Sequence, residues 1–121
     1  MDVVTIQNRT RNTVIAERAE LAASWWARLR GLIGRRELAA GSGLLIRPCS
    51  SIHTCFMAFP IDVLFVDRND RALQCHAAVP AWRFGPVAPK ARYVIELPPG
   101  ALAASGTQPG DQIECVRRAM P

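Results

Sequence analysis

The sequence contains few of the residues and patterns that mark secreted, membrane-spanning or metal-binding proteins. It has two histidines and a single lysine, Lys90, among 121 residues. No apolar run reaches the roughly 18 residues that a membrane-spanning helix needs. The first residues, MDVVTIQN, lack the basic head and apolar segment of a secretory signal. We therefore expect a cytoplasmic protein that does not associate with a membrane.

Cysteine is present but without the spacing that usually gives it a function. The four cysteines are Cys49, Cys55, Cys75 and Cys115, and no two of them form a C-x-x-C pair. That spacing is typical of structural zinc sites and of thiol redox motifs. The cytosol also keeps thiols reduced. We expect free thiols, no disulfide framework and no bound cofactor.

The composition predicts one globular domain over residues 1–121. Half of the residues are hydrophobic and 21% are charged, which is enough apolar surface for a single core. The net charge of +5 comes mainly from arginine, and the arginines are scattered apart from a local cluster at 28–36. Nucleic-acid binding usually needs a more continuous basic surface. We expect a monomer or weak dimer whose partner is a small polar ligand or a protein.

Short β-branched segments separated by turn residues dominate the chain. The expected strands lie at residues 3–6, 13–16, 44–46, 52–57, 61–66, 72–79, 92–97 and 112–116. The expected helices are short, at 25–33 and 101–104, and residues 80–89 are expected to form a loop. This order predicts a mainly β, jelly-roll-like sandwich or barrel of about seven or eight short strands with one or two short helices. Within 72–79, alternation predicts that Cys75 and Ala77 point inward and that Gln74 and His76 point outward.

The stretch IHTCFMAFPIDVLFVD, residues 52–67, places four chemically distinctive side chains in an apolar run. They are His53, Cys55, Met57 and Asp62. A buried carboxylate without a partner is costly, so Asp62 should be either satisfied or used. One interpretation pairs it with an arginine of the 28–35 segment. The other places it beside His53 at the mouth of a pocket.

Four segments, in order, resemble a known family. They are RLRGLIGR at 28–35, GLLI at 43–46, HTCFM and PIDVLF within 53–65, and VIELPPG at 94–100 followed by Gly110-Asp111. This order is similar to the uncharacterised bacterial and archaeal family called domain of unknown function 192. The resemblance implies a compact, mostly β, jelly-roll-like domain without an established activity. Two positions depart from the pattern: Ala58 replaces an expected basic residue, and Cys55 an expected aromatic one.

The leading functional hypothesis is a non-enzymatic binding or accessory module for a small polar or anionic ligand, or for a peptide end. In this hypothesis His53 and Asp62 donate and accept hydrogen bonds, arginines hold the negative group, and Met57 forms an apolar floor. Arg28 and Arg35, together with Trp82 from the 80–89 loop, close the site. The candidate ligand-binding residues are Arg28, Arg35, His53, Met57, Asp62 and Trp82.

Two alternatives use overlapping residues. In the first, the chain is a metalloprotein or hydrolase-like enzyme that uses His53, Cys55 and Asp62. An extended 52–57 segment would place His53, Cys55 and Met57 on one face, and these soft donors suit copper(I) or zinc. No nucleophile, base and orienting group can be identified together, so we assign no catalytic residue. In the second, Trp25, Trp26 and the nearby arginines form a protein-interaction surface.

We predict that native electrospray mass spectrometry of protein purified without chelator gives the mass of the bare chain, because Cys55 and Met57 are also common core residues. A mass excess equal to one zinc or copper ion contradicts this prediction. In that case His53→Ala and Cys55→Ser should each lose the ion. A structural Cys55 instead tolerates serine with only a modest loss of stability.

Overall fold

The computed structural model describes residues 3–22, 38–48, 51–53 and 59–117, and these residues form a mainly β fold. The elements in chain order are β1 (Val3–Asn8), β2 (Thr13–Ala22), β3 (Ser42–Ile46), β4 (Ser51–His53), β5 (Ile61–Val66), β6 (Ala72–Val79), β7 (Phe84–Val87), β8 (Tyr93–Leu97), α2 (Ala101–Ser105) and β9 (Ile113–Arg117). The mainly β prediction is confirmed. The helix expected at 25–33 lies outside the described residues.

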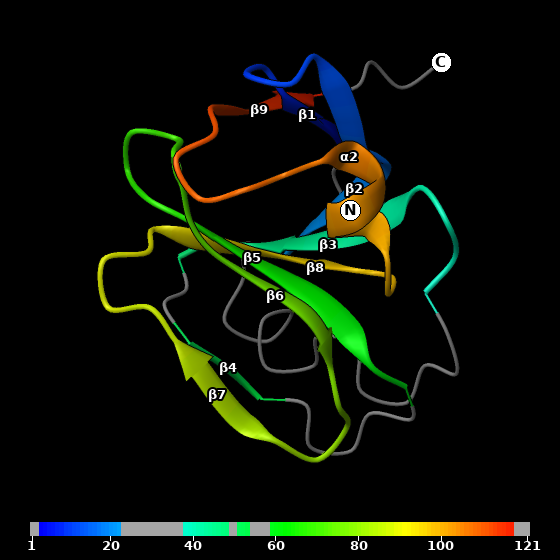
Figure 1. Cartoon of the computed structure of the whole chain (residues 1–121), viewed down its shortest axis with the longest axis vertical. Helices are drawn as coiled ribbons and strands as arrows, with labels where there is room; N and C mark the ends of the chain where they lie inside the picture. The colour runs from blue at the N-terminus through cyan, green and yellow to red at the C-terminus, as the bar shows by residue number, and fades with distance from the viewer. Residues whose placement is uncertain (1–2, 23–37, 49–50, 54–58, 118–121) are drawn as a thin grey trace.

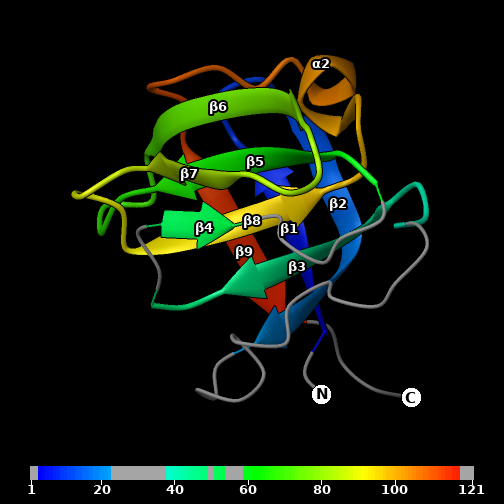
Figure 2. The ribbon, with the colours of Figure 1, turned by 90° about the horizontal axis from the view of Figure 1, so that it is seen from below.

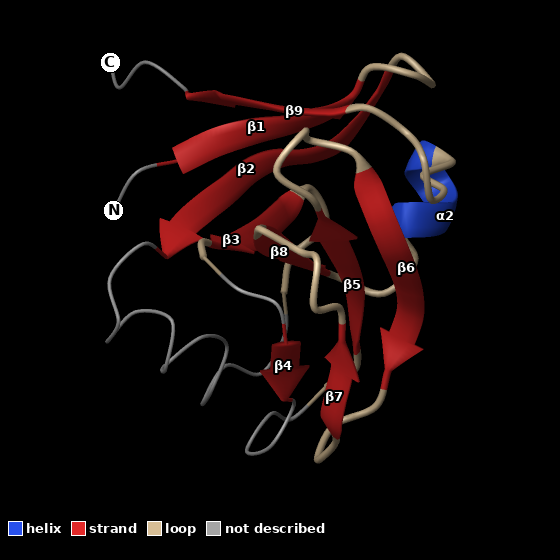
Figure 3. Cartoon of the chain, turned by 90° about the vertical axis from the view of Figure 1, so that its left-hand side faces the viewer, coloured by secondary structure: helices blue, strands red, loops and turns tan. Residues whose placement is uncertain are grey.

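The main sheet curls into a half-barrel (Figure 1). Its seven strands follow the order β6-β5-β8-β3-β2-β1-β9, and every neighbouring pair is antiparallel except β2 with β3. Strands β4 and β7 form a separate two-stranded sheet. This small sheet lies across the outer face of β5 and β8, at the end of the molecule away from β1 and β9 (Figures 2 and 3).

Strands β5 and β8 are buried on both faces, because alternate residues enter two different cores. The inner core lies inside the curl and includes Leu64 of β5, Ile95 of β8 and Leu102 of α2. The outer core lies on the opposite face and includes Phe65 of β5 and Val94 of β8. Burial on both faces explains why the sequences of these two strands are almost continuously apolar.

Two strand predictions were wrong: one strand was missed and another was predicted too short. In both cases the strand is formed by pairing with a segment that is distant in the sequence. Residues 84–87, expected to lie in a loop, form β7, which pairs with the three-residue β4. Proline and glycine in FGPV gave no strand signal, but an edge strand tolerates proline. Strand β2 continues to Ala22 instead of ending at residue 16, because its second half pairs in parallel with β3.

The side-chain alternation expected for β6 is broken by two bulges. Its register with β5 shifts between Ile61 and Val63, and again between Phe65 and Val66. Each shift inserts one extra residue into β6, which moves the side chains that follow to the other face. Ala77 is therefore exposed, contrary to prediction. His76 is partly buried, with its ring edge-on to Phe65 at a centroid distance of 6.0 Å.

The two edge strands of the half-barrel meet at one end. An isolated antiparallel bridge joins Arg71, just before β6, to Gln112, just before β9. The backbone N–H of Ala72 donates to the carbonyl of Asp111 at 2.9 Å, and the N–H of Gly110 donates to the carbonyl of Ala72 at 2.8 Å. These bonds close the curl at this end and satisfy edge groups that would otherwise be open to pairing.

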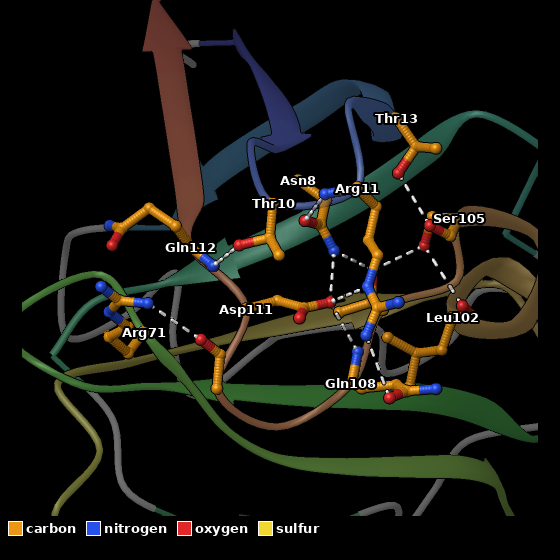
Figure 4. Close-up of polar contacts among 12 residues, drawn as sticks. Asn8, Thr10, Arg11, Thr13, Arg71, Leu102, Ser105, Gln108, Asp111 and Gln112 are labelled. Carbon is orange, nitrogen blue, oxygen red and sulfur yellow. Dashed lines mark hydrogen bonds and ion pairs between the residues drawn. The ribbon is translucent and has the colours of Figure 1, made fainter.

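The buried carboxylate of Asp111 organises this closed end (Figure 4). Its Oδ2 accepts hydrogen bonds from the Asn8 side chain at 2.9 Å, the Gln108 backbone N–H at 3.0 Å and the Arg11 Nε at 3.1 Å. Asn8 also donates to Thr107 at 3.1 Å. Burial alone raises the pKa of Asp111, but these hydrogen bonds and the Arg11 charge outweigh it and lower that pKa below its ordinary value of 3.8.

We predict that Asp111 makes folding stability depend on pH in the acid range. A lowered folded-state pKa means that its contribution is complete above the unfolded pKa and is lost as pH falls below 3.8. Asp111→Asn should cost about 1–3 kcal/mol at pH 7 and should flatten the acid dependence of the free energy of unfolding. Urea titrations between pH 7 and pH 2.5 measure both effects.

Glu114→Gln is the control, since Glu114 forms an exposed ion pair with Arg9 at 3.2 Å. It should change the free energy of unfolding at pH 7 by less than about 1 kcal/mol. Equal acid dependence in the Asp111→Asn variant and the natural chain would contradict the role assigned to Asp111.

Candidate functional site

Asp62 is fully buried, and backbone N–H groups satisfy its carboxylate. Its Oδ1 accepts from Ala78 at 2.9 Å, and its Oδ2 accepts from Gly100 at 3.1 Å and Leu102 at 3.0 Å. Gly100 has a φ of 94°, the left-handed region that glycine adopts without strain. Asp62 thus ties β5 to the bulged end of β6 and to the start of α2. The sequence predicted an arginine partner from residues 28–35, which lie outside the described residues.

A shallow, open cavity of about 490 Å³ lies beside the bulged end of β6. Residues 75–80 form one wall, and Arg83, Gly85 and Pro86 form the other. Ala78, one of the residues that Asp62 holds, belongs to the first wall. Among the described residues that line this cavity there is no aspartate or glutamate, whereas Arg83 and His76 are present. The cavity therefore favours neutral or anionic ligands over cations.

Trp82 lies in the chain segment that borders this cavity and is 58% exposed. Its φ is +62°, and that of Ala78 is +50°. Positive φ is uncommon for residues other than glycine, and such strained positions cluster at functional sites. A large, exposed ring held in a fixed backbone conformation is a suitable stacking surface for a planar ligand.

The backbone of His53 lies in the same part of the fold. Strand β4 pairs with β7 so that the Cα of His53 faces that of Phe84. Phe84 follows Trp82 by two residues, so this register brings the predicted site residues His53 and Trp82 near each other. Their common neighbourhood depends on the β4–β7 pairing, which joins segments about thirty positions apart and which no local pattern indicated.

The other predicted site residues lie outside the part of the chain that the structure describes. These residues are Arg28, Arg35 and Met57, together with Cys55, Trp25 and Trp26 of the alternative hypotheses. Their roles stay predictions. Of the six candidate ligand-binding residues, the structure describes the side chains of Asp62 and Trp82 and the backbone of His53.

The described cysteines have the properties of structural thiols. Cys75 and Cys115 form no disulfide. Burial, together with the charge of Asp111, raises the pKa of Cys75 to about 11, so its thiol is protonated at neutral pH and is a weak nucleophile. Within the described ranges, no three histidine, cysteine or acidic side chains are grouped so that they could hold a metal ion. Nor does any helix in these ranges have the length and apolarity needed to cross a membrane.

Glu96 is a third buried acid, after Asp111 and Asp62. It is 4% exposed in strand β8, which has a neighbouring strand on each side. Its Cα partners are Leu44 of β3 and Val63 of β5, two residues of the outer core. The apolar run YVIEL was a usable signal, because a strand with neighbours on both sides and cores on both faces has no exposed position.

The comparisons with known proteins agree with the resemblance seen in the sequence. The model of the DUF192 family, described as uncharacterized ACR, matches residues 4–115. The chain belongs to this family. A UPF0127 protein of Thermococcus sibiricus is 31% identical over 111 residues, which cover 88% of this chain and 71% of that protein. UPF0127 protein PH1112 of Pyrococcus horikoshii is 32% identical over 112 residues, which cover 90% and 96% of the two chains.

A solved structure supports the fold of this DUF192 chain. The crystal structure of a protein of unknown function from Novosphingobium aromaticivorans superposes with a TM-score of 0.79 at 26% identity. The match covers 93% of this chain and 83% of that one. None of these relatives carries an assigned activity in its name. A function for this DUF192 protein therefore has to be argued from its own residues.

We predict that Asp62→Ala destabilises the protein by about 3 kcal/mol or more, because it leaves three backbone N–H groups without their acceptor beside the buried core. Asp67→Ala is a matched control. The Asp67 Oδ1 also accepts from backbone N–H groups, those of Asn69 and Arg71, but in an exposed turn where water can replace it. That variant should lose about 1 kcal/mol. Urea unfolding measures both values, and equal losses would contradict the special role of Asp62.

Proposed function

We propose that this DUF192 protein is a non-enzymatic binding module whose cavity between β6 and β7 takes a small, planar, anionic ligand. The observation that carries the proposal is the combination of an exposed Trp82, two walls that contain His76 and Arg83, and the absence of acidic residues from the described part of the cavity lining. Each feature is common by itself. Together, a cavity of about 490 Å³ that contains His76 and Arg83 and an exposed Trp82 in the adjoining segment support a small-ligand site.

Two interactions would hold the ligand: stacking on the ring of Trp82 and pairing of its negative group with Arg83. An indole ring offers a flat apolar surface to a planar ligand, and a guanidinium offers paired donors to a carboxylate or phosphate. His76 lies 2.8 Å from the Gln74 side chain, with its Nε2 facing Oε1, which fixes the orientation of the ring at the cavity wall. A ligand that stacks on Trp82 would present its anionic group toward Arg83.

Residues predicted from the sequence extend this site. The β4–β7 pairing supports a place for His53 beside the cavity. In the proposal, Arg28 and Arg35 add positive charge and Met57 adds an adaptable apolar surface. Asp62 serves the site indirectly, because its carboxylate holds the backbone of Ala78 in the cavity wall.

Binding rather than catalysis is proposed because the groups described at the cavity form no catalytic set. A hydrolase of this kind needs a nucleophile, a base and an orienting group in mutual reach. Asp62, the acid that the enzyme hypothesis would use, is occupied by backbone N–H groups. The thiol of Cys75 is held protonated by burial, which raises its pKa to about 11.

We predict that benzoate, a planar monoanion, binds this cavity more tightly than neutral benzamide. Titration of ¹⁵N-labelled protein should give saturable shifts in the amides of residues 75–86. Trp82→Ala should weaken both probes, because both stack, whereas Arg83→Gln should weaken benzoate by about fivefold or more and leave benzamide unchanged.

Arg68→Gln is the control variant for charge, since Arg68 is exposed in the turn between β5 and β6 and does not line the cavity. It should bind benzoate as the natural chain does. Equal affinity for benzoate and benzamide, or shifts that avoid residues 75–86, would overturn the proposed function.

A further inference from the structure

A second cavity, of about 440 Å³, lies where the ends of β6 and β9 close the half-barrel. Its lining is strongly polar and contains Arg9, Arg47, Asp70 and residues 112–115. Among the described residues, none lines both this cavity and that of the proposed function. The two acids and two arginines at one opening need a separate explanation, because they come from four separate parts of the chain.

The guanidinium of Arg47 lies over the ring of Tyr93. The guanidinium carbon lies 4.8 Å from the centroid of the Tyr93 ring, which is within the range of a cation–π contact. The ring itself is 2% exposed, and its hydroxyl donates to the Asp70 Oδ1 at 2.8 Å. A guanidinium that stacks by its face leaves the N–H groups at its edge available to a planar acceptor.

The two arginines of this cavity differ in how their charges are balanced. Arg9 forms an ion pair with Glu114 at 3.2 Å. Among the described residues, no carboxylate forms an ion pair with Arg47. Arg47 is exposed at the cavity that it lines, so its guanidinium can bind a carboxylate from solution by donating hydrogen bonds to it. Asp70 lines the same cavity and can meet a positive group of the same ligand.

We propose that this cavity is a second binding site and that it takes a small zwitterion of the α-amino acid type. The planar guanidinium of Arg47 pairs with the carboxylate, and Asp70 accepts from the ammonium group. Asp70 and Glu114 repel a dianion such as phosphate, so the site selects a monocarboxylate. The site is independent of the cavity between β6 and β7 and does not rest on the proposed function.

The single tyrosine of the chain gives this site its own spectroscopic signal. Protein made with 3-fluorotyrosine carries one ¹⁹F label, at position 93, directly beneath Arg47. Glycine, acetate and inorganic phosphate are titrated against this label, with sodium chloride at matched ionic strength as the blank. Glycine should give a saturable shift, acetate a weaker one, and phosphate no more than the blank.

Two variants test the two halves of the ligand. Arg47→Gln removes the guanidinium and should lower the affinity for glycine by about tenfold or more, because a charge-assisted hydrogen-bond pair is lost. Asp70→Asn keeps an acceptor for the Tyr93 hydroxyl and suits the positive φ of 61° at this position. It should reduce the affinity for glycine to that for acetate.

Arg18→Gln is the matched control, because Arg18 is an exposed arginine of β2 outside this cavity. It should leave the glycine titration unchanged. The proposal is overturned if glycine gives no saturable shift, if Arg47→Gln binds glycine as the natural chain does, or if phosphate binds more tightly than glycine. Loss of benzoate binding at residues 75–86 leaves this result untouched, so the two proposals fail separately.

Discussion

The contact between the Asp62 carboxylate and three backbone N–H groups is the interaction on which the arrangement of this fold depends. One side chain in β5 holds the bulged end of β6 and the first residues of α2, which follow Asp62 by 16, 38 and 40 positions. A buried carboxylate is stable only when its oxygens are satisfied. Because Asp62 is buried, the β6 bulge and the start of α2 must lie where their backbone N–H groups can donate to its carboxylate.

The bulged end of β6 links this constraint to the surface. The register shift between Ile61 and Val63 lies opposite Ala77, which is exposed, and Ala78, which is left-handed, and both line the cavity beside β7. A regular β6 would present a flat edge at this place. The bulge and the contacts of Asp62 thus shape the β6 wall of the cavity, and Arg83, Gly85 and Pro86 form the opposite wall. This division is typical of sites in which a rigid scaffold positions variable polar groups.

The opposite end of the half-barrel uses the same physical principle with different residues. Asp111 gathers Asn8, Arg11 and the Gln108 backbone, and so closes the gap between the two edge strands. Next to this closure Tyr93 supports Arg47 from below and donates to Asp70. At both ends a satisfied carboxylate fixes the backbone, and exposed cations lie nearby. Each of the two proposed binding cavities of this DUF192 chain thus lies beside a buried, hydrogen-bonded acid.

The amino-acid sequence by itself determined the local elements of this protein. Alternating and β-branched runs at 61–66 and 72–79, and the turn between them, depend on neighbours a few positions away, and the structure has these strands where they were expected. The family motifs at residues 94–100 and 110–111 could also be recognised in the sequence, because each consists of consecutive residues. Only the tertiary structure decided what these residues contact.

The partners of Asp62, the burial of Glu96, and the pairing of His53 with Phe84 all join segments distant in the sequence. The bulges in β6 also depend on pairing between strands. One inserted residue moves the following side chains to the other face of the sheet, and the local sequence pattern does not indicate it. Side-chain type and spacing are local properties. Burial and hydrogen-bond partners depend on which strands pair. Strand pairing is decided only when the chain folds into its tertiary structure.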